Sequence, residues 1–211
     1  MKKSILTVFG LHESEKIIEK SRFLTYSRHI ESEEEARAFI AEIRKKHPFA
    51  THCCFAFIAD KAGNLQRFSD DGEPQGTAGV PILDVLKNKG LCEVAVAVVR
   101  YFGGIKLGAG GLVRAYSSSA AENLAGADIR SLEWCVEIAI EVDYTGIDGV
   151  QKYLSTRTCT LLSTDYGEKV TFTAAVKAEE KESFKEGLID YMQGRVFVRD
   201  GKEYYGAFKN E

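Results

Sequence analysis

The chain has 211 residues and a net charge of −3, with 45% hydrophobic and 28% charged residues, as is typical of a soluble globular protein. The acidic balance excludes a general electrostatic attraction to nucleic acid, so a polyanion could bind only at a local patch. No apolar run has membrane-spanning length, no signal peptide precedes the first expected strand, and the five cysteines form no CxxC pair, so we expect a cytoplasmic protein with reduced thiols.

The first part of the chain predicts strands and one helix. Strands are expected at 4–9, 14–25 and 50–59, where Ile, Val, Phe and Tyr are frequent. Ser32 is expected to begin the helix, because Glu35 stands three residues later and completes a capping box. Pro48 is expected to end it, after a run of basic residues that suits the negative end of a helix.

His52 lies in the third of these strands beside Cys53, and it could be a catalytic residue or a metal ligand. Adjacent residues of a strand point to opposite faces, however, and no second Cys/His pair follows at zinc spacing. A hydrogen-bonded histidine that lines a cleft is the simpler interpretation.

A loop rich in turn-forming residues is expected at 67–81, and it brings Asp70, Asp71 and Glu73 close together. Such carboxylates repel one another unless a cation, an arginine or backbone N–H groups compensate their charge, so the loop is a candidate Mg²⁺ site. The simpler interpretation is turn chemistry, in which the aspartates accept local backbone hydrogen bonds and Glu73 pairs with a basic neighbour. Thr77 is the expected cap of the helix that follows, which ends at Gly90.

The chain is organised around a strand, a glycine loop and a helix. Residues 94–99 are all apolar, as in a central strand buried on both sides. After the loop, one helix face is expected to carry Val113, Tyr116, Ala120 and Leu124. Because a helix N-terminus presents unpaired N–H groups, the arrangement suits an anion, unless the glycines serve packing alone. The expected anion- or nucleic-acid-binding residues are Arg100, Gly103, Gly104, Lys106, Gly108, Gly110, Gly111 and Arg114.

The last part of the chain predicts a second domain. The boundary is expected at 126–131, between domains of residues 1–128 and 129–211. The second domain is expected to contain a strand at 133–142, a helix at 146–155, strands at 158–164 and 169–177, a helix at 181–193 and a strand at 195–199. This β-α-β-β-α-β order is ferredoxin-like, and the chain as a whole is expected to be α+β. The fold implies no activity by itself, since it hosts many.

Two stretches of the chain resemble the signatures of the IMPACT/YigZ family. They are residues 69–81 and 99–116, and His52 also fits the family's pattern. The resemblance is strong over roughly the first 125 residues. It implies a first domain with the fold shared by the second domain of a small-subunit ribosomal protein, GHMP kinases and domain IV of elongation factor G. The rest of the chain resembles the small domain that bacterial members append, which implies similarity to the last domain of elongation factor G.

In eukaryotic relatives the family domain acts in translational control. Those relatives carry an extra N-terminal domain, so that role does not transfer to this chain. The resemblance and the loop with Arg100, Lys106 and Arg114 together favour a non-enzymatic cytosolic binding protein that docks on RNA, the ribosome or a translation factor. We expect no cofactor, no metal and no specificity for DNA. The alternative is an enzyme that handles phosphate or nucleotide, in which the glycine loop cradles phosphate and the acidic loop holds Mg²⁺. Fold kinship with GHMP kinases favours it by analogy, although the glycine loop lacks the serine pair of those kinases. In either case we expect one cleft, lined by His52, Asp70, Asp71, Glu73 and Thr77, in which Arg100 or Arg114 neutralises a carboxylate.

Overall fold

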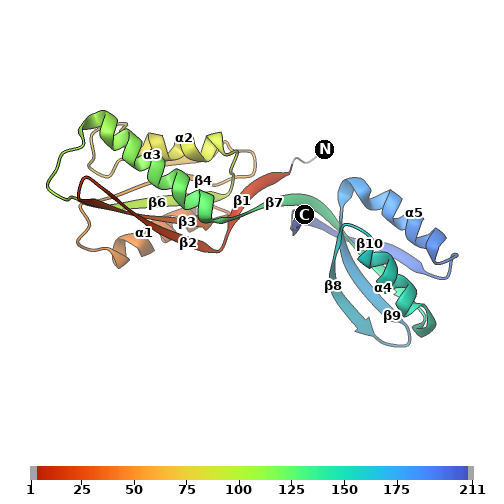
Figure 1. Ribbon diagram of the computed structural model, residues 1–211. Coiled ribbons are helices and arrows are strands. Elements are labelled where there is room, and N and C mark those ends of the chain that lie inside the picture. The colour runs from red at the N-terminus through yellow and green to blue at the C-terminus, as the bar shows by residue number, and fades with distance from the viewer. Residues whose placement is uncertain (1–3, 209–211) are drawn as a thin grey trace. The chain divides into compact units, whose positions relative to one another are not determined.

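The computed structural model describes residues 4–208, which divide into two compact units (Figure 1). The first unit is Ile5–Arg130, and the second consists mainly of the chain from Ser131 onward. No helix within residues 4–208 combines the length and apolar character needed to span a membrane. The expected boundary at 126–131 is not a loop, because one long strand begins at Asp128 and continues through it.

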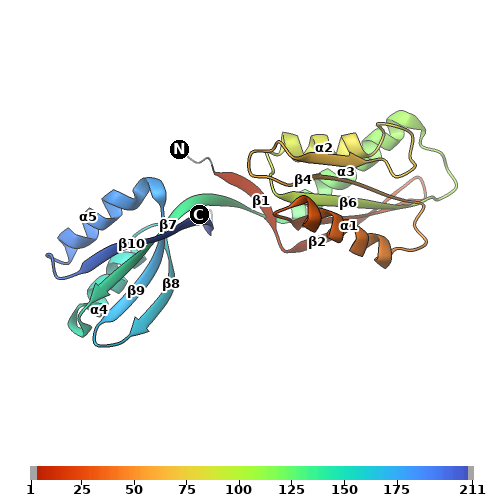
Figure 2. The ribbon, with the colours of Figure 1, turned by 180° about the vertical axis from the view of Figure 1, so that it is seen from behind.

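The first unit is an antiparallel sheet between two layers of helices. Its strands lie in the order β2-β3-β6-β4-β5. Helices α2 and α3 cover one face (Figure 1), and α1 covers the other, as Figure 2 shows from behind. The elements are β1 (Ile5–Phe9), β2 (Leu11–Ile18), β3 (Ser21–His29), α1 (Glu33–Lys46), β4 (His52–Ile58), β5 (Gln66–Ser69), α2 (Gly79–Asn88), β6 (Val94–Tyr101) and α3 (Gly108–Gly126).

Strand β6 is the buried centre of this sheet, as its apolar run predicts. Val94, Val96 and Val98 pack toward α2 and α3, whereas the alternate residues Ala95 and Ala97 pack toward α1. Adjacent Cys53 and Cys54 of β4 are divided between the same two cores, so each thiol is buried on its own side of the sheet.

The ends of α1 also follow the prediction. The Ser32 hydroxyl accepts a hydrogen bond of 3.1 Å from the Glu35 N–H, and His47 follows the last helical residue as the C-cap, directly before Pro48. In a capping box the Glu35 carboxylate would accept the N–H of the cap residue, Ser32. Here it accepts the N–H of Glu31, one residue earlier, at 2.8 Å.

Three expectations for the strands and buried helix faces of the first unit are wrong. The single strand expected at 14–25 is a hairpin, because Glu19 and Lys20 turn the chain with φ of 44° and 64°. Strand β5 lies in the segment expected to be loop. Val113 is 38% exposed, and the buried face of α3 uses Leu112 instead, together with Tyr116, Ala120 and Leu124 as expected.

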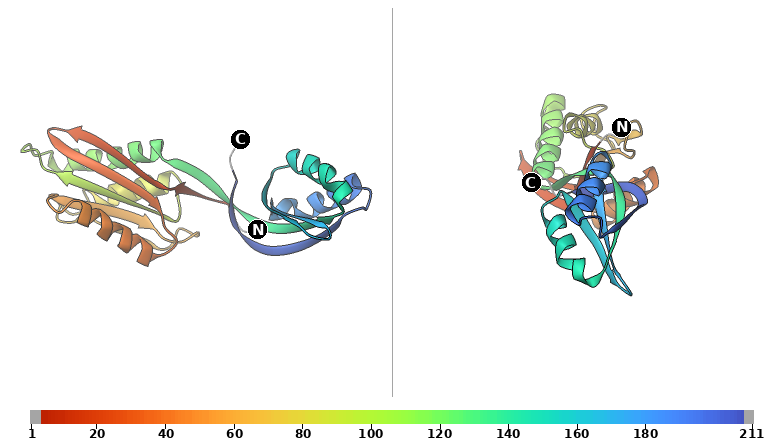
Figure 3. Two further views of the ribbon diagram at one scale, coloured as in Figure 1. Left: turned by 90° about the horizontal axis from the view of Figure 1, so that it is seen from below. Right: turned by 90° about the vertical axis from the view of Figure 1, so that its right-hand side faces the viewer.

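The second unit has the β-α-β-β-α-β order that the sequence predicts, and its strands lie in the order β10-β7-β9-β8. Helices α4 and α5 lie side by side on one face of this sheet (Figure 3), around Tyr153, whose ring contacts Phe184 and Tyr191. The final strand is longer than expected. The elements are β7 (Asp128–Val142), α4 (Ile147–Ser155), β8 (Cys159–Tyr166), β9 (Val170–Lys177), α5 (Lys181–Tyr191) and β10 (Phe197–Phe208), with short 3-10 turns at Tyr144–Gly146 and Ala178–Glu180.

Candidate functional site

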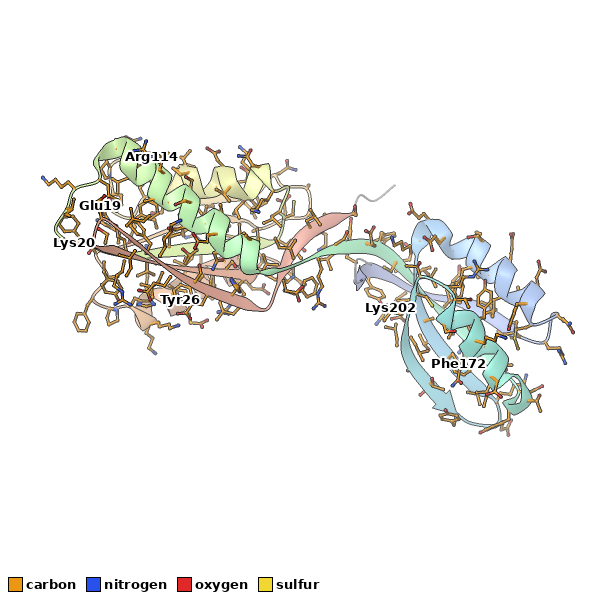
Figure 4. All side chains as sticks on the ribbon, viewed as in Figure 1. Glu19, Lys20, Tyr26, Arg114, Phe172 and Lys202 are labelled. Carbon is orange, nitrogen blue, oxygen red and sulfur yellow. The ribbon has the colours of Figure 1, made fainter. Side chains whose placement is uncertain are left out.

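The predicted site residues gather at one end of the first unit. Here β6 ends and β4 begins, since His52 pairs with Arg100 in the ladder between them. The hairpin of β2 and β3 turns at the same end, where Arg22 pairs with Tyr101. Figure 4 shows Glu19 and Lys20 of this turn at the end of the unit that also carries Arg114 of α3.

A buried ion pair lies beneath this end of the sheet. Arg100 is 4% exposed, and its Nη1 donates a hydrogen bond of 2.7 Å to Glu73 Oε1. The Tyr116 hydroxyl donates to the same oxygen at 2.8 Å. Burial, and then its neighbours Cys54 and Glu73, raise the pKa of Tyr116 strongly, so the hydroxyl keeps its proton. Arg100 therefore neutralises Glu73, as expected, but it is not available to an anion in solvent, and its assignment as an anion-binding residue is wrong.

His52 is a hydrogen-bonded residue at the rim of this buried pair, in line with the simpler interpretation. Its Nδ1 donates to the backbone carbonyl of Asp71 at 2.8 Å, and its Nε2 lies 3.9 Å from Glu73 Oε2. Within residues 4–208, no group of three or more His, Cys, Asp or Glu side chains could hold a metal ion.

Asp70 caps helix α2. Its Oδ1 accepts the N–H groups of Ala78 and Gly79 at 3.0 and 2.8 Å, and its Oδ2 accepts the N–H of Gly76 at 2.8 Å. Burial alone would raise the pKa of Asp70, but these three hydrogen bonds outweigh it and hold the pKa below its usual value. Thr77 is not the cap as expected, because its hydroxyl donates backward to the Pro74 carbonyl at 2.6 Å.

Asp71 has yet another set of partners. Its Oδ2 accepts the Cys53 N–H at 2.7 Å, and its Oδ1 lies 2.8 Å from Nη2 of Arg44. The three carboxylates of the acidic loop thus point to a helix N-terminus, to an arginine of α1 and to the buried Arg100. They do not converge on one position, which contradicts the Mg²⁺ alternative, whereas Asp70 on local backbone N–H groups and Glu73 on a basic residue agree with the turn chemistry that the sequence favours.

The glycines of the loop before α3 have different roles. A Cβ atom at Gly103 would overlap the backbone carbonyl of Lys20, so this glycine lets the loop pack on the β2–β3 turn. Gly104 and Gly108 have φ of 89° and 68°, which glycine adopts without strain. A Cβ atom at Gly111 would lie 3.0 Å from the Leu107 Cβ, whereas Gly110 has an open surface with Arg114 Nη1 as its nearest neighbour at 3.8 Å.

A groove with a volume of about 590 Å³ runs beside the N-terminus of α3, and we call it the α3 groove. Its lining includes Lys106 and Arg114, both exposed. Neither cation forms an ion pair with a described residue, whereas Lys16, which also lines the groove, pairs with Glu122 at 2.7 Å. Of the predicted basic residues, the structure therefore brings Lys106 and Arg114 together at the surface and places Arg100 inside.

Sequence reasoning missed two parts of this site. It treated Tyr116 as a purely apolar core residue, although a buried tyrosine hydroxyl needs a hydrogen-bond partner, which is the signal that could have linked it to Glu73. It also missed Ser21, whose hydroxyl accepts hydrogen bonds from Arg100 Nη2 at 3.3 Å and from the Gly103 N–H at 3.2 Å. Nothing in the sequence near Ser21 indicates this role.

Comparison with known proteins places the chain in a family. The model of the Impact N-terminal domain matches residues 19–124, and that of a domain of unknown function (DUF1949) matches residues 140–195. The chain is 38% identical over 202 residues to IMPACT family member YvyE of Bacillus subtilis, covering 96% of this chain and 93% of that protein.

Further relatives agree. IMPACT family member YigZ of Escherichia coli is 36% identical over 181 residues, which cover 85% of this chain and 89% of that protein. A crystal structure described as that of a hypothetical protein superposes with a TM-score of 0.62 at 33% identity, covering 94% of this chain and 97% of the other. The protein whose buried Arg100–Glu73 pair and α3 groove are described above is a member of the IMPACT family.

Proposed function

We propose that this chain is a non-enzymatic cytoplasmic binding protein, linked to translation or its regulation, that binds RNA at the α3 groove, either as free RNA or as part of the ribosome. The observation that carries the proposal is the exposure of Lys106 and Arg114 together beside a helix N-terminus, without ion pairs to described residues. Such side chains attract phosphate oxygens, and the aligned N–H groups of the helix add to the attraction.

The expected kinship with translation proteins belongs to the same proposal. The β-α-β-β-α-β order of the second unit supports a relation to the last domain of elongation factor G, and the layered first unit is compatible with the fold of its domain IV. The proposal also allows a translation factor as the partner. In that case the chain should bind the factor in the absence of RNA. The Mg²⁺-dependent enzyme loses its main support, because Asp70, Asp71 and Glu73 already have protein partners.

The test is fluorescence anisotropy with short RNAs and with ribosomes over a series of salt concentrations. If Lys106 and Arg114 each contact one phosphate, a plot of the logarithm of the affinity against the logarithm of the salt concentration should have a slope of about −1.4, at roughly −0.7 per contact. Lys106→Ala and Arg114→Ala should each weaken binding and reduce the slope by about one contact's share. Lys87→Ala is the matched control, because Lys87 is an exposed lysine of α2 outside the groove.

Two outcomes would contradict the proposal. One is that the unaltered protein binds neither RNA nor ribosomes at low salt. The other is that Lys106→Ala and Arg114→Ala leave both the affinity and the salt slope unchanged.

A further inference from the structure

Two exposed aromatic rings lie on the loops at the same end of the first unit, and the proposed function does not use them. Phe49, between α1 and β4, is 89% exposed, and Phe102, directly after β6, is 46% exposed. Leaving a phenylalanine this exposed forgoes the stabilisation that burial of its ring would give. Since single exposed apolar residues are common, the two rings are candidates for contacts outside the chain only through what surrounds them.

Hydrogen bonds join the two loops into one surface. The Thr51 N–H donates to the Arg100 carbonyl at 2.8 Å, and the Phe102 N–H donates to the Thr51 hydroxyl at 3.0 Å. Thr51 is two residues from Phe49, so its two hydrogen bonds connect the loop that carries Phe49 to the loop that carries Phe102.

The ring of Phe102 is also supported from inside. The guanidinium carbon of Arg100 lies 5.4 Å from its centroid, and Arg100 is itself fixed by Glu73. The ring thus rests on a buried cation that cannot move away, while nearly half of the residue stays exposed. A supported ring with an open side suits a flat partner, because stacking then costs little conformational entropy.

Unpaired lysines accompany both rings. Lys45 precedes Phe49 by four residues and Lys106 follows Phe102 by four, and both lysines are exposed without ion pairs to described residues. Exposed rings alone would also suit an apolar protein segment. The presence of both exposed rings and exposed cations in these segments favours a polyanion that carries flat groups, which is the chemistry of a nucleic acid with unpaired bases.

We propose that the ligand of this end of the protein is single-stranded RNA, with bases stacked on Phe49 and Phe102 and the backbone on Lys106 and Arg114. The inference rests on the proposed function, and it adds that the bases must be unpaired. A duplex hides the faces of its bases, so the rings could not reach them, although the cations could still contact its phosphates.

The experiment compares a labelled RNA of about ten nucleotides with the same sequence annealed to its complement, by fluorescence anisotropy. Phe49→Ala should weaken binding of the single strand roughly 5-fold to 150-fold, the range for loss of one stacked base. Phe102→Leu should weaken it in the same direction, and Phe49→Tyr should retain the affinity because it keeps a ring. None of these variants should change duplex binding or the salt slope, since stacking releases no counterions.

The matched control is Phe68→Leu, because Phe68 is 48% exposed on β5, outside the surface formed by the two loops. Circular dichroism of each variant checks that the fold is retained. The inference is overturned if Phe49→Ala and Phe102→Leu leave single-strand affinity unchanged, or if they weaken single strand and duplex equally.

Those results would leave the proposed function standing as long as Lys106→Ala still weakens binding. If neither form of RNA binds at low salt, both proposals fail. In that case the rings would be contacts for a protein, and a titration with a translation factor would become the direct measurement.

Discussion

The carboxylate of Glu73 holds two buried groups of the first unit at once, the guanidinium of Arg100 and the hydroxyl of Tyr116. A buried ion pair of this kind adds little net stability by itself, because both charges lost their water on folding. Removing one partner is a different matter, since it leaves the other charge buried and uncompensated. The pair therefore acts mainly as a specific connection between the acidic loop, β6 and α3.

Glu73→Gln should lower the free energy of unfolding by about 3 kcal/mol or more, because Arg100 keeps its charge without a counter-charge. Urea denaturation measures the loss. The control is Glu122→Gln, which breaks the exposed pair with Lys16 and should change stability by about 1 kcal/mol or less. Equal losses in the free energy of unfolding would mean that the buried pair stabilises the protein no more than the exposed pair does.

The cysteines should react slowly in the native protein. Burial, the largest cause, raises the pKa of Cys53 to about 11, so at neutral pH almost none of it is the reactive thiolate. Cys92 and Cys159 are only half-buried and should be modified first. Titration with a thiol reagent, with and without denaturant, checks this order, and fast modification of Cys53 or Cys54 in the native protein would contradict it.

At the scale of elements, the N-terminus of α2 depends on a side chain that precedes the helix by nine residues. Asp70 satisfies the N–H groups of Gly76, Ala78 and Gly79, which would otherwise lack partners. The carboxylate also faces the positive end of the helix macrodipole. The acidic loop is thereby folded back onto the start of the helix.

Asp70→Asn should destabilise the protein by about 1–2 kcal/mol at neutral pH, because one amide oxygen replaces two carboxylate oxygens. The pKa of Asp70 is lowered in the folded state, so its contribution is present above the unfolded-state pKa, near 3.9, and is lost as the pH falls through the lower folded-state value. The stability difference between the two proteins should therefore shrink in acid. Denaturation curves from pH 7 to pH 3 measure it, and a difference independent of pH would contradict the assignment.

The elements that the sequence predicts well are those whose signals are local. The apolar run of β6, the cap at Ser32 and most of the buried face of α3 depend on residues a few positions apart. The β2–β3 hairpin was missed because Glu19 and Lys20 adopt positive φ without Gly, Asn or Asp to indicate a turn. The partner of Arg100 is 27 residues away in sequence, and tertiary packing alone selects Glu73 over its two acidic neighbours.

The candidate site lies entirely within the first unit. The α3 groove, the two exposed rings and the buried ion pair all come from Ile5–Arg130. The two units also have separate hydrophobic cores, since the cluster around Phe172 contains no residue of the first unit. Folding of the first unit, and the RNA binding proposed for it, should therefore not need the second.

A fragment of residues 1–130 should fold and bind RNA with the affinity of the full chain. Circular dichroism reports its folding and anisotropy its affinity, with the Lys106→Ala fragment as the control for specific binding. A folded fragment that no longer binds would show that the second unit contributes to the interaction.

Gly103 has a consequence for how the proposed RNA-binding surface could change by mutation. A Cβ atom at Gly103 would overlap the backbone of Lys20, so this position admits no side chain, whereas Ile105, Lys106 and Ala109 nearby in the sequence are exposed. Substitutions at these three exposed positions should change the displayed chemistry at a smaller cost in stability than any substitution of Gly103. The binding preference of this surface could therefore be changed by mutation, and a library randomised at 105, 106 and 109 would be the place to begin.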